Sequence, residues 1–404
     1  MIVKDNTWRQ RRLAVPKRTS ELIALIALSS TLFLFLHTRD LHSRLHEMEV
    51  RLQPGEDEGL SANQLSSEGV QTSMRSESAG SSGVVHYYST INQRLTESYD
   101  DLRQILDIDA LNNTRRARKQ VIFFNRVPKV GSQTFMELLR RLSLSNGFSF
   151  NRDRVQRVET IRLAPIEQLQ LASMVSGYSE PSVYIKHVCF TNFTEFNLPE
   201  PIYVNLVRDP VERVISWYYY VRAPWYYVER KQIFPDLPLP DPNWLKKDFE
   251  SCVLRGDREC RYLEGETHEG IGDHRRQTLF FCGHSEKCTP FNTAGALERA
   301  KLAVEKHYAV VGVLEDINST LTVLENYIPK FFRGATDVYW DEVNSFTKIN
   351  RNFFKPPVSE EIKDLVRKNF TREIEFYQFC RQRLHRQLRA LRLTNLPLQE
   401  ENNV

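Results

Sequence analysis

The chain has 404 residues, 41% of them hydrophobic, and a formal net charge of +4 at pH 7. This length accommodates one large domain with appendages, and this hydrophobic fraction is ordinary for a globular protein with a real core. So small a net charge excludes recognition of a polyanion by a global electrostatic field, and a polyanionic partner would need a local basic groove.

The N-terminal segment predicts a membrane anchor. Residues 1–20 carry six basic side chains against one acidic side chain, and residues 22–36 read LIALIALSSTLFLFL without a charge. Such a run approaches the length of a spanning helix, and its basic flank should stay in the cytoplasm. A cleaved signal peptide is the alternative, but no A-x-A-like site follows the run. We therefore expect a cytoplasmic tail at 1–20 and a signal-anchor transmembrane helix at 21–38.

Residues 39–118 predict a lumenal stem. They are net acidic, with nine Arg against thirteen Asp and Glu. Within residues 39–52, Leu and Met recur at helical spacing, which fits either a short coiled coil that oligomerises the protein or a lone amphipathic helix. Residues 53–83 are rich in Ser, Gly and Glu, a composition typical of a flexible tether.

All six cysteines follow the apolar run, which predicts that they lie in an oxidising lumen. No C-x-x-C spacing occurs, so no metal site is expected. Local disulfides are the simplest interpretation, and the remaining two cysteines are candidate free thiols. The local pairs are Cys252 with Cys260 and Cys282 with Cys288, which leaves Cys189 and Cys380. Four N-x-S/T sequons predict glycosylation at Asn112, Asn192, Asn318 and Asn369.

An α/β domain is predicted over residues 119–390, followed by a tail at 391–404. The run VIFF (121–124) has the character of a buried strand and leads through a tight loop into an amphipathic helix, whose apolar face carries Phe135, Leu138, Leu139 and Leu142. Further strands are expected at 182–190, 201–209 and 308–315, and helices at 166–177, 210–221, 294–307, 317–332 and about 359–391. This alternation predicts a central, mostly parallel sheet flanked by helices. The Pro-rich aromatic stretch 223–244 predicts a surface loop or lid.

The loop between the first strand and its helix is a candidate anion site. Backbone N–H groups and a helix N-terminus converge in such a loop and bind phosphate or sulfate. A lysine adds charge, hydroxyls add donors, and a glycine permits close approach of the anion. The residues concerned are Lys129, Val130, Gly131, Ser132, Gln133 and Thr134. The Walker A pattern G-x-x-x-x-G-K-[ST] is absent, which weakens an ATPase or GTPase interpretation. The alternative is an ordinary turn with a solvated lysine.

A second candidate anion site begins at Arg208, which follows the strand at 201–209. Asp209 and Pro210 have the residue types of a helix cap and a first helical position. Ser216 comes eight residues after Arg208, close to two helical turns, so both side chains can face one ligand. Arginine can grip a phosphate with two hydrogen bonds, and serine can add a third. The alternative is a structural ion pair between Arg208 and Asp209 or Glu212.

These two stretches, NRVPKVGSQT (125–134) and VRDPVERVISWYY (207–219), together resemble the signature pair of cytosolic and Golgi sulfotransferases. Further stretches, such as FFCGHSEKC (280–288) and PKFFRGATDVY (329–339), resemble the family of heparan sulfate and uronyl 2-O-sulfotransferases. This similarity extends over roughly residues 120–385. The sequence PKVGSQTFMELLRRL resembles those of the branch of the family that contains the insect dorsal-ventral patterning protein Pipe.

The resemblance implies a P-loop-like sulfotransferase fold and 3′-phosphoadenylyl sulfate (PAPS) as the sulfuryl donor. In this family the loop from Lys129 to Thr134 would hold the 5′-phosphosulfate, and Arg208 with Ser216 would hold the 3′-phosphate. Arg333 resembles a nucleotide-side position. Lys348 and Arg351 would cover the adenine or the 3′-phosphate. The family also pairs the four cysteines in the local manner described above.

His187, at the end of the expected strand 182–190, is the candidate catalytic base. Sulfuryl transfer needs a group that takes the proton of the acceptor hydroxyl, and a neutral histidine suits lumenal pH. A lone histidine on a strand is more often structural, and the resemblance is what assigns it the catalytic role. It also places Lys129 to neutralise charge on the departing nucleotide. Ile185 stands where heparan sulfate 2-O-sulfotransferase has a second histidine, which puts heparan sulfate as the acceptor in doubt.

Two arginines are candidate acceptor contacts. The resemblance places Arg126 beside the acceptor, and Arg222 flanks the Pro-rich stretch, where the alternative is a solvated surface charge. The sequence thus predicts a homo-oligomeric Golgi PAPS-dependent 2-O-sulfotransferase. Its acceptor would be a uronic acid of a glycosaminoglycan or glycoprotein glycan, without a role for metal or nucleic acid. The alternatives are a P-loop phosphotransferase and a catalytically silent, glycan-binding relative.

Overall fold

In the computed structural model, the described residues are 107–267, 276–345 and 355–394. The predicted cytoplasmic tail, the signal-anchor helix at 21–38, most of the stem and the end of the C-terminal tail lie outside these ranges. Among the described residues, no helix combines the length and the apolar character that crossing a membrane requires.

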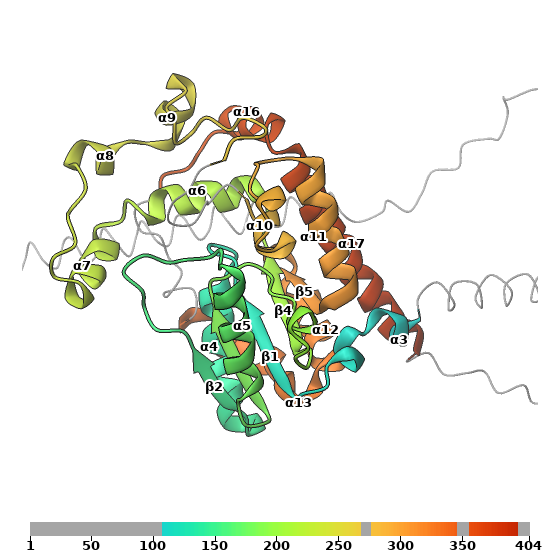
Figure 1. Cartoon of the computed structure of the whole chain (residues 1–404). Coiled ribbons are helices and arrows are strands. Elements are labelled where there is room, and N and C mark those ends of the chain that lie inside the picture. Colours follow the sequence, from blue (N-terminus) through green and yellow to red (C-terminus); the bar gives the residue numbers. More distant parts are fainter. Residues whose placement is uncertain (1–106, 268–275, 346–354, 395–404) are drawn as a thin grey trace, which may run out of the picture. The chain divides into compact units, whose positions relative to one another are not determined.

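A five-stranded sheet forms the centre of the described part of the chain (Figure 1). The strands are β1 (Val121–Asn125), β2 (Ser149–Arg152), β3 (Ser182–Lys186), β4 (Ile202–Val207) and β5 (Tyr308–Val313). All neighbours pair in parallel, in the order β2-β3-β1-β4-β5. Four of the strands are buried throughout and confirm the predicted strands, although β3, β4 and β5 end earlier than expected. Strand β2 was not predicted because its sequence, SFNR, is short and partly exposed, so only its pairing with β3 defines it.

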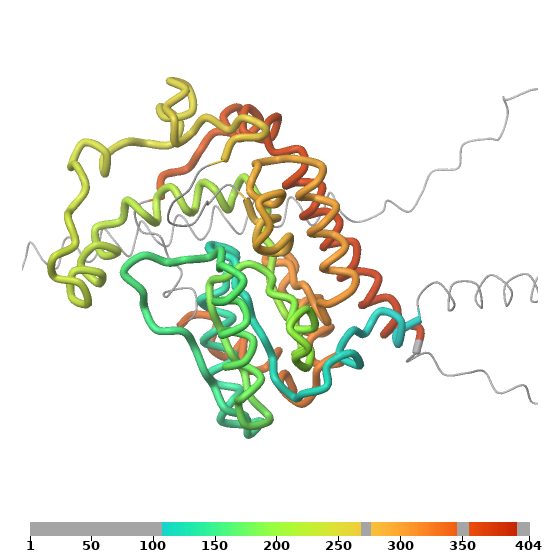
Figure 2. The backbone as a smooth tube through the Cα atoms, in the orientation of Figure 1, coloured from blue at the N-terminus to red at the C-terminus, as the bar shows by residue number. Residues whose placement is uncertain are grey.

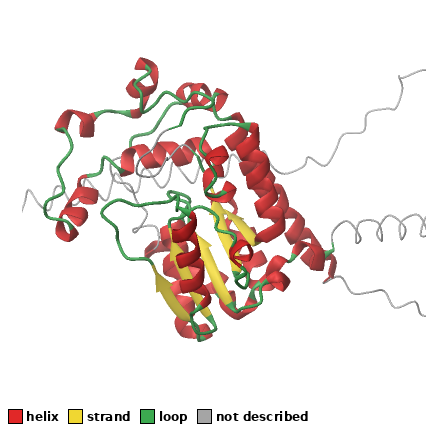
Figure 3. Ribbon diagram, in the orientation of Figure 1, coloured by secondary structure: helices red, strands yellow, loops and turns green. Residues whose placement is uncertain are grey.

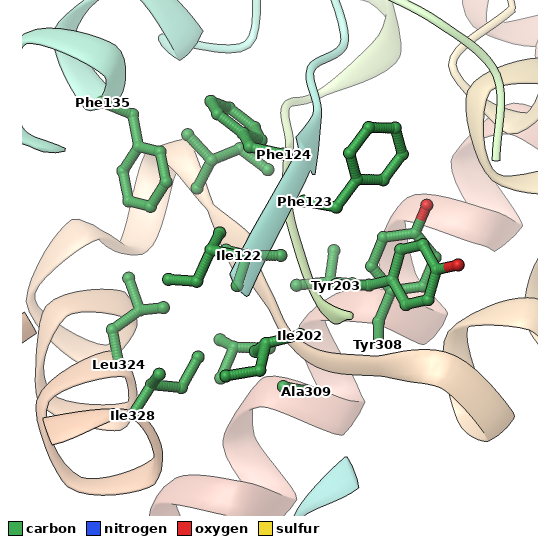
Figure 4. Close-up of a cluster of buried hydrophobic side chains, with 14 of the residues drawn as sticks. Ile122, Phe123, Phe124, Phe135, Ile202, Tyr203, Tyr308, Ala309, Leu324 and Ile328 are labelled. Carbon is green, nitrogen blue, oxygen red and sulfur yellow. The ribbon is translucent and has the colours of Figure 1, made fainter. Parts of the chain in front are cut away.

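Aromatic side chains of β1 alternate between the two faces of the sheet, as strand geometry requires. Phe124 packs against Phe135 of helix α4 (Ser132–Asn146), with ring centroids 5.1 Å apart. Phe123 packs on the opposite face against Tyr203 of β4, with centroids 5.9 Å apart. Figure 4 shows these two groups on opposite sides of β1. The sheet is therefore the middle layer of the core.

Helices connect the strands and flank the sheet (Figure 3), which confirms the predicted α/β fold with a central parallel sheet. The longer helices besides α4 are α5 (Pro165–Ser176), α6 (Pro210–Tyr220), α11 (Ala294–His307), α12 (Ile317–Tyr327) and α17 (Thr371–Thr394). The shorter helices are α3 (Ile108–Leu111), α7 (Pro224–Ile233), α8 (Pro242–Lys246), α9 (Phe249–Arg255), α10 (Thr278–Cys282), α13 (Pro329–Phe332), α14 (Ala335–Asp341) and α16 (Glu360–Lys368). 3₁₀ turns lie at Asn113–Arg116, Phe193–Phe196, Glu286–Cys288 and Leu314–Asp316.

Proline positions account for two differences from the sequence prediction. The stretch 223–244 is not a plain loop, because α7 and α8 begin there with proline at the first helical position. The N–H at that position has no partner within a helix, so proline loses no hydrogen bond there. The helix expected at 317–332 divides at Ile328, where Pro329 opens the separate helix α13. Prolines in these stretches thus start helices rather than exclude them.

The C-terminal helical region also divides. The single helix expected at about 359–391 is α16 followed by α17, with the break at Asn369 and Phe370. Ser359 is the N-cap of α16, as predicted. Figure 2 shows the end of α17 beside the first described residues of the chain. There the side chains of Arg383 and Gln387 donate to the carbonyl oxygen of Leu111, at 3.5 and 3.0 Å.

Both predicted disulfides are present, Cys252–Cys260 and Cys282–Cys288. The other two cysteines, Cys189 and Cys380, are buried free thiols, also as predicted. All four sequon asparagines are at least partly exposed, so none of Asn112, Asn192, Asn318 and Asn369 is sterically sealed in the core.

Candidate active site

The loop after β1 has the backbone geometry of an anion site. Lys129 and Gly131 both have left-handed backbone angles, with φ of 65° and 80°, and Gly131 caps helix α4. The left-handed φ of Gly131 favours glycine, and a Cβ atom there would lie 2.6 Å from a methyl carbon of Leu314, whose side chain would have to shift. The hydroxyl of Ser132 donates to the carbonyl of Val127 at 2.9 Å and closes the loop from within. The result is a fixed turn at the N-terminus of a long helix.

Lys129 has no carboxylate partner among the residues that the structure describes. Its ammonium group lies 4.0 Å from the ring centroid of Tyr220. Burial first, and then the charges of Arg208, Arg126 and Lys355, lower the pKa of Lys129 to about 8. A lysine surrounded by cations in this way favours an anionic ligand, because a bound anion relieves the repulsion.

Arg208 brings the second predicted anion element to the same place. It directly follows β4, and its Nη1 donates to the carbonyl oxygen of Lys129 at 3.3 Å. Ser216, two turns along α6, is buried with 7% of its surface exposed. Asp209 caps α6 and Pro210 takes its first position, as predicted. The two loops therefore form one cationic site at the carboxyl ends of β1 and β4.

The alternative partner of Arg208 is only loosely placed. Its guanidinium lies 3.7 Å from the carboxylate of Glu212, which is beyond hydrogen-bond distance. Glu212 instead receives Lys355 and Lys363, each at 3.0 Å. Although burial works to raise it, hydrogen bonds from Lys363 and Lys355 lower the pKa of Glu212 to about 2. The charge of Glu212 is thus already balanced. Arg208 also lies 3.9 Å from the carboxylate of Glu315, so neither acidic neighbour is within hydrogen-bond distance and the guanidinium can still bind a further anion.

His187 immediately follows β3 and has the form of a general base. Its Nδ1 lies 2.9 Å from the carbonyl oxygen of Arg126. Because a carbonyl can only accept, Nδ1 carries the proton and Nε2 keeps its lone pair. Burial, and next the charge of Arg126, lower the pKa of His187 well below its ordinary value. The ring is therefore neutral near pH 7 and able to take a proton at Nε2.

Arg126 lies between the base and the anion loop. One end of its guanidinium meets Met136 sulfur at 3.2 Å and the other meets the side-chain oxygen of Gln133 at 3.4 Å. Its Nε is buried without a hydrogen-bond partner in the described part of the chain. The carboxylate of Glu159 is near enough to interact with it electrostatically. So weakly satisfied a guanidinium can accept a carboxylate or sulfate as a ligand.

Two predicted ligand residues lie in other surroundings. Arg222 is 5% exposed, pairs with Glu259 at 2.6 Å and stacks on Tyr218 and Trp244, with its Cζ 3.5 and 4.0 Å from their centroids. It therefore holds α6 and α8 together. Arg333 is exposed at the far end of α4, about 22 Å of helix from the anion loop, so its geometry does not fit a nucleotide contact.

Sequence reasoning missed several members of the site. Tyr220 beneath Lys129 belongs to the run SWYYY, which signals aromatic packing but not which ring meets the lysine. No local sequence pattern pointed to Lys355, because its partner Glu212 lies about 140 residues earlier in the chain. The predicted contacts Lys348 and Arg351 lie outside the described residues.

One cluster of three potential metal ligands occurs among the described residues, formed by Cys252, Asp257 and Glu259. Its sulfur is in a disulfide, and both carboxylates already pair with basic side chains. These atoms are thus committed to structural contacts.

Comparison with known proteins defines the class of protein. A model of the sulfotransferase family matches residues 112–380, and the chain belongs to this family. The chain is 37% identical to the uronyl 2-sulfotransferase homolog pip of Drosophila melanogaster, with 96% of this chain and 92% of the relative covered. It is 30% identical to mouse uronyl 2-sulfotransferase, with 67% of this chain and 64% of the relative covered. It is 31% identical to heparan sulfate 2-O-sulfotransferase 1 of Xenopus laevis, with 73% of this chain and 77% of the relative covered. The predicted resemblance to the 2-O-sulfotransferases and Pipe is confirmed.

Proposed function

We propose that the chain is a PAPS-dependent 2-O-sulfotransferase that acts on a uronic acid hydroxyl of a glycosaminoglycan or glycoprotein glycan. The names of its relatives support this reaction and this class of acceptor. The observation that carries the proposal is the hydrogen bond from Arg208 to the backbone of Lys129. It joins two anion-binding elements, from separate strands, into one site for a nucleotide with phosphates at both ends.

The residues present fit such a donor. PAPS supplies a sulfuryl group on its 5′-phosphate and leaves as PAP. Lys129, Val130 and the N-terminus of α4 up to Thr134 would hold the 5′ end, while Arg208 and Ser216 would hold the 3′-phosphate. Two observations support the fit: the left-handed turn at Gly131 favours a residue without a Cβ, and Lys129 has a lowered pKa among neighbouring cations.

In the proposed reaction His187 accepts a proton and Lys129 stabilises the leaving group. Nε2 of His187 takes the proton of the acceptor hydroxyl as that oxygen forms its bond to sulfur, and the bond between sulfur and the bridging phosphate oxygen breaks. The ammonium of Lys129 neutralises the charge that develops on this departing oxygen. Arg126, whose charge acts on both His187 and Lys129, would bind a carboxylate or sulfate of the acceptor sugar and orient it toward His187.

The cellular setting is part of the proposal. A cytoplasmic tail at 1–20, an anchor at 21–38 and a stem at 39–118 would make the chain a single-pass type II Golgi membrane protein with a lumenal catalytic domain. The two disulfides and the accessible sequons support a lumenal location. The helical spacing in residues 39–52 supports a homo-oligomer.

The test uses full-length protein in detergent. It is incubated with ³⁵S-labelled PAPS or γ-³²P-labelled ATP and a panel of desulfated glycans, followed by disaccharide analysis of the product. We expect ³⁵S on the 2-O position of a uronic acid and no transfer of ³²P. His187→Ala should bind PAP normally and lose at least about 100-fold in kcat. The control is Gln382→Ala, a change at an exposed position of α17, which should retain full activity.

Each other outcome removes a defined part of the proposal. Transfer of ³²P would make the protein a phosphotransferase. Binding of glycan and PAP without turnover would make it a catalytically silent, glycan-binding relative. Full turnover by His187→Ala would remove the histidine from its role.

A further inference from the structure

The stretch FFCGHSEKC lies in a segment that contacts both halves of the candidate active site. We call residues Gln277–Thr289 the bridging segment. It contains helix α10, the turn Glu286–Cys288 and the disulfide Cys282–Cys288. The disulfide closes the loop that carries His284, so the segment is covalently tied at its second half.

The first end of the bridging segment fixes the backbone of Arg208. The side-chain amide of Gln277 accepts from the N–H of Arg208 at 3.4 Å and donates to its carbonyl oxygen at 3.1 Å. Gln277 is completely buried. One amide thus bonds both polar atoms of the residue from which the phosphate-binding guanidinium projects, as a neighbouring strand would.

The C-terminal helix α17 holds this end in place. The carboxylate of Glu373 accepts from the backbone N–H groups of Gln277 and Thr278, at 2.9 and 3.2 Å, and also from the Thr278 hydroxyl. Glu373 is itself fully buried. The orientation of Gln277 is therefore determined by packing rather than by solvent.

The middle of the segment bonds to the chain that follows the base. The carbonyl oxygen of Phe280 accepts from the N–H of Phe190 at 2.8 Å and from the side chain of Asn125 at 2.9 Å. The same amide group of Asn125 reaches the carbonyl of Val188 at 3.4 Å. These bonds draw residues 188–190 away from β3 and explain why that strand ends at Lys186.

The far end of the segment holds the same chain through His284. Its Nδ1 accepts from the N–H of Leu163 at 2.9 Å, so its proton lies on Nε2. Nε2 donates to the hydroxyl of Thr191 at 2.9 Å, and that hydroxyl donates to the carbonyl of Cys189 at 3.2 Å. Burial lowers the pKa of His284 to about 4, so the ring stays neutral and keeps both bonds.

We propose that Gln277 and His284 are positioning residues for the two halves of the reaction. Gln277 acts through Arg208 on the nucleotide, and His284 acts through residues 188–191 on His187. The segment between them fixes the distance from the 3′-phosphate site to the base. This inference rests on the proposed sulfuryl transfer, and it assigns a role to a motif that contacts neither substrate.

The two ends should fail in different ways. Gln277→Met keeps the side-chain volume but loses both bonds, so the affinity for PAP should fall about tenfold, the equivalent of one strong hydrogen bond, while kcat at saturating PAPS changes little. His284→Leu should lower kcat about tenfold or more at unchanged PAP affinity. Gln382→Met, an exposed glutamine on α17, is the matched control and should change neither quantity.

The pH profile supplies a readout that a merely structural role would not move. Burial keeps the pKa of His187 well below its ordinary value. When residues 188–191 are loosened in His284→Leu, water reaches the ring, and the acid limb of kcat should shift upward toward pH 6.5, the ordinary value for histidine. His284→Asn, which retains an acceptor near the Nδ1 position, should recover part of the loss.

The experiment measures PAP affinity by calorimetry, kcat against pH, and the melting temperature of the full-length variants. Thr191→Val, which keeps the shape of the side chain, and Gln277→Asn, which shortens the amide without adding charge, are second variants and decide the outcome should the first pair not fold. Equal losses of PAP affinity and kcat at both ends would overturn the inference in favour of a general structural role. Failure of the wild-type protein to transfer ³⁵S would instead overturn the proposed function itself.

Discussion

Lys129→Met should stabilise the nucleotide-free protein while abolishing its turnover. Methionine matches the length of the lysine stem without its charge. In the folded chain, burial and the charges of Arg208, Arg126 and Lys355 lower the pKa of Lys129 from 10.5 to about 8. Such a difference corresponds to about 3 kcal/mol of unfavourable free energy for the charged form at pH 7. Discounted for partial exposure, the expected gain in the free energy of unfolding is about 1–3 kcal/mol.

The sign follows from linkage. A lysine whose pKa is lower in the folded state destabilises that state wherever it is charged, which is below about pH 8, and the cost disappears as pH rises toward 10.5. For a domain of this size, a gain of 1 kcal/mol raises the melting temperature by about 2–4 °C. The advantage of Lys129→Met should therefore be seen at pH 7 and vanish near pH 10.

The assay compares melting temperatures with and without saturating PAP, together with kcat. Nucleotide should stabilise the wild-type protein more than the variant, because only the wild type gains the ion pair. Turnover should fall about 10²–10³-fold, the usual loss for one preorganised charge. An unchanged or lower melting temperature for nucleotide-free Lys129→Met would refute the interpretation that this charge is uncompensated in the folded chain.

Three further predictions follow from the same geometry. As pH rises through about 8, Lys129 loses its charge, and kcat/KM for PAPS should fall. Because the pKa of His187 is lowered, kcat/KM should not change between pH 7 and pH 6. A profile of kcat/KM over pH 5.5–9.5 checks both limbs. Gly131→Ala should weaken PAP binding in calorimetry, while Gly147→Ala, which has a similar left-handed φ but open space, should cost only about 1–2 kcal/mol of stability. Arg222→Met should lower the free energy of unfolding in urea by about 2–3 kcal/mol without changing KM for the acceptor.

Local signals predicted most of the fold and the centre of the site. The unbroken apolar runs identified four strands, and the strand-loop-helix pattern identified the turn around Gly131. Asp209 and Pro210 marked the start of α6 because cap and first-turn chemistry depend on adjacent residues only. Strand β2 carried no such signal, because a short, partly exposed strand is defined by its neighbour.

The surroundings of Arg222 and Arg333 could not be predicted, for a different reason. Arg222 and Arg333 were assigned from their position next to aromatic or family-like stretches, whereas the role of an arginine depends on what the folded chain places opposite it. For Arg222 that partner is Glu259, 37 residues away. Gln277 and Lys355 were not noticed for the same reason, since each acts on a residue at least 69 positions distant. Long-range pairing of polar side chains has no periodicity in a single sequence.

The order of the strands also has a consequence for how the chain folds. Between Val207 and Tyr308 the chain makes an excursion of about 100 residues before it returns as the neighbouring strand. Both disulfides lie inside this excursion and close only short loops, so they do not tie its ends together. Pairing of β4 with β5 is a non-local event of the kind that slows folding, and an unpaired strand edge invites association with other chains. Newly made chains that stall there would have formed the turn around Gly131 but not yet the pairing of β4 with β5.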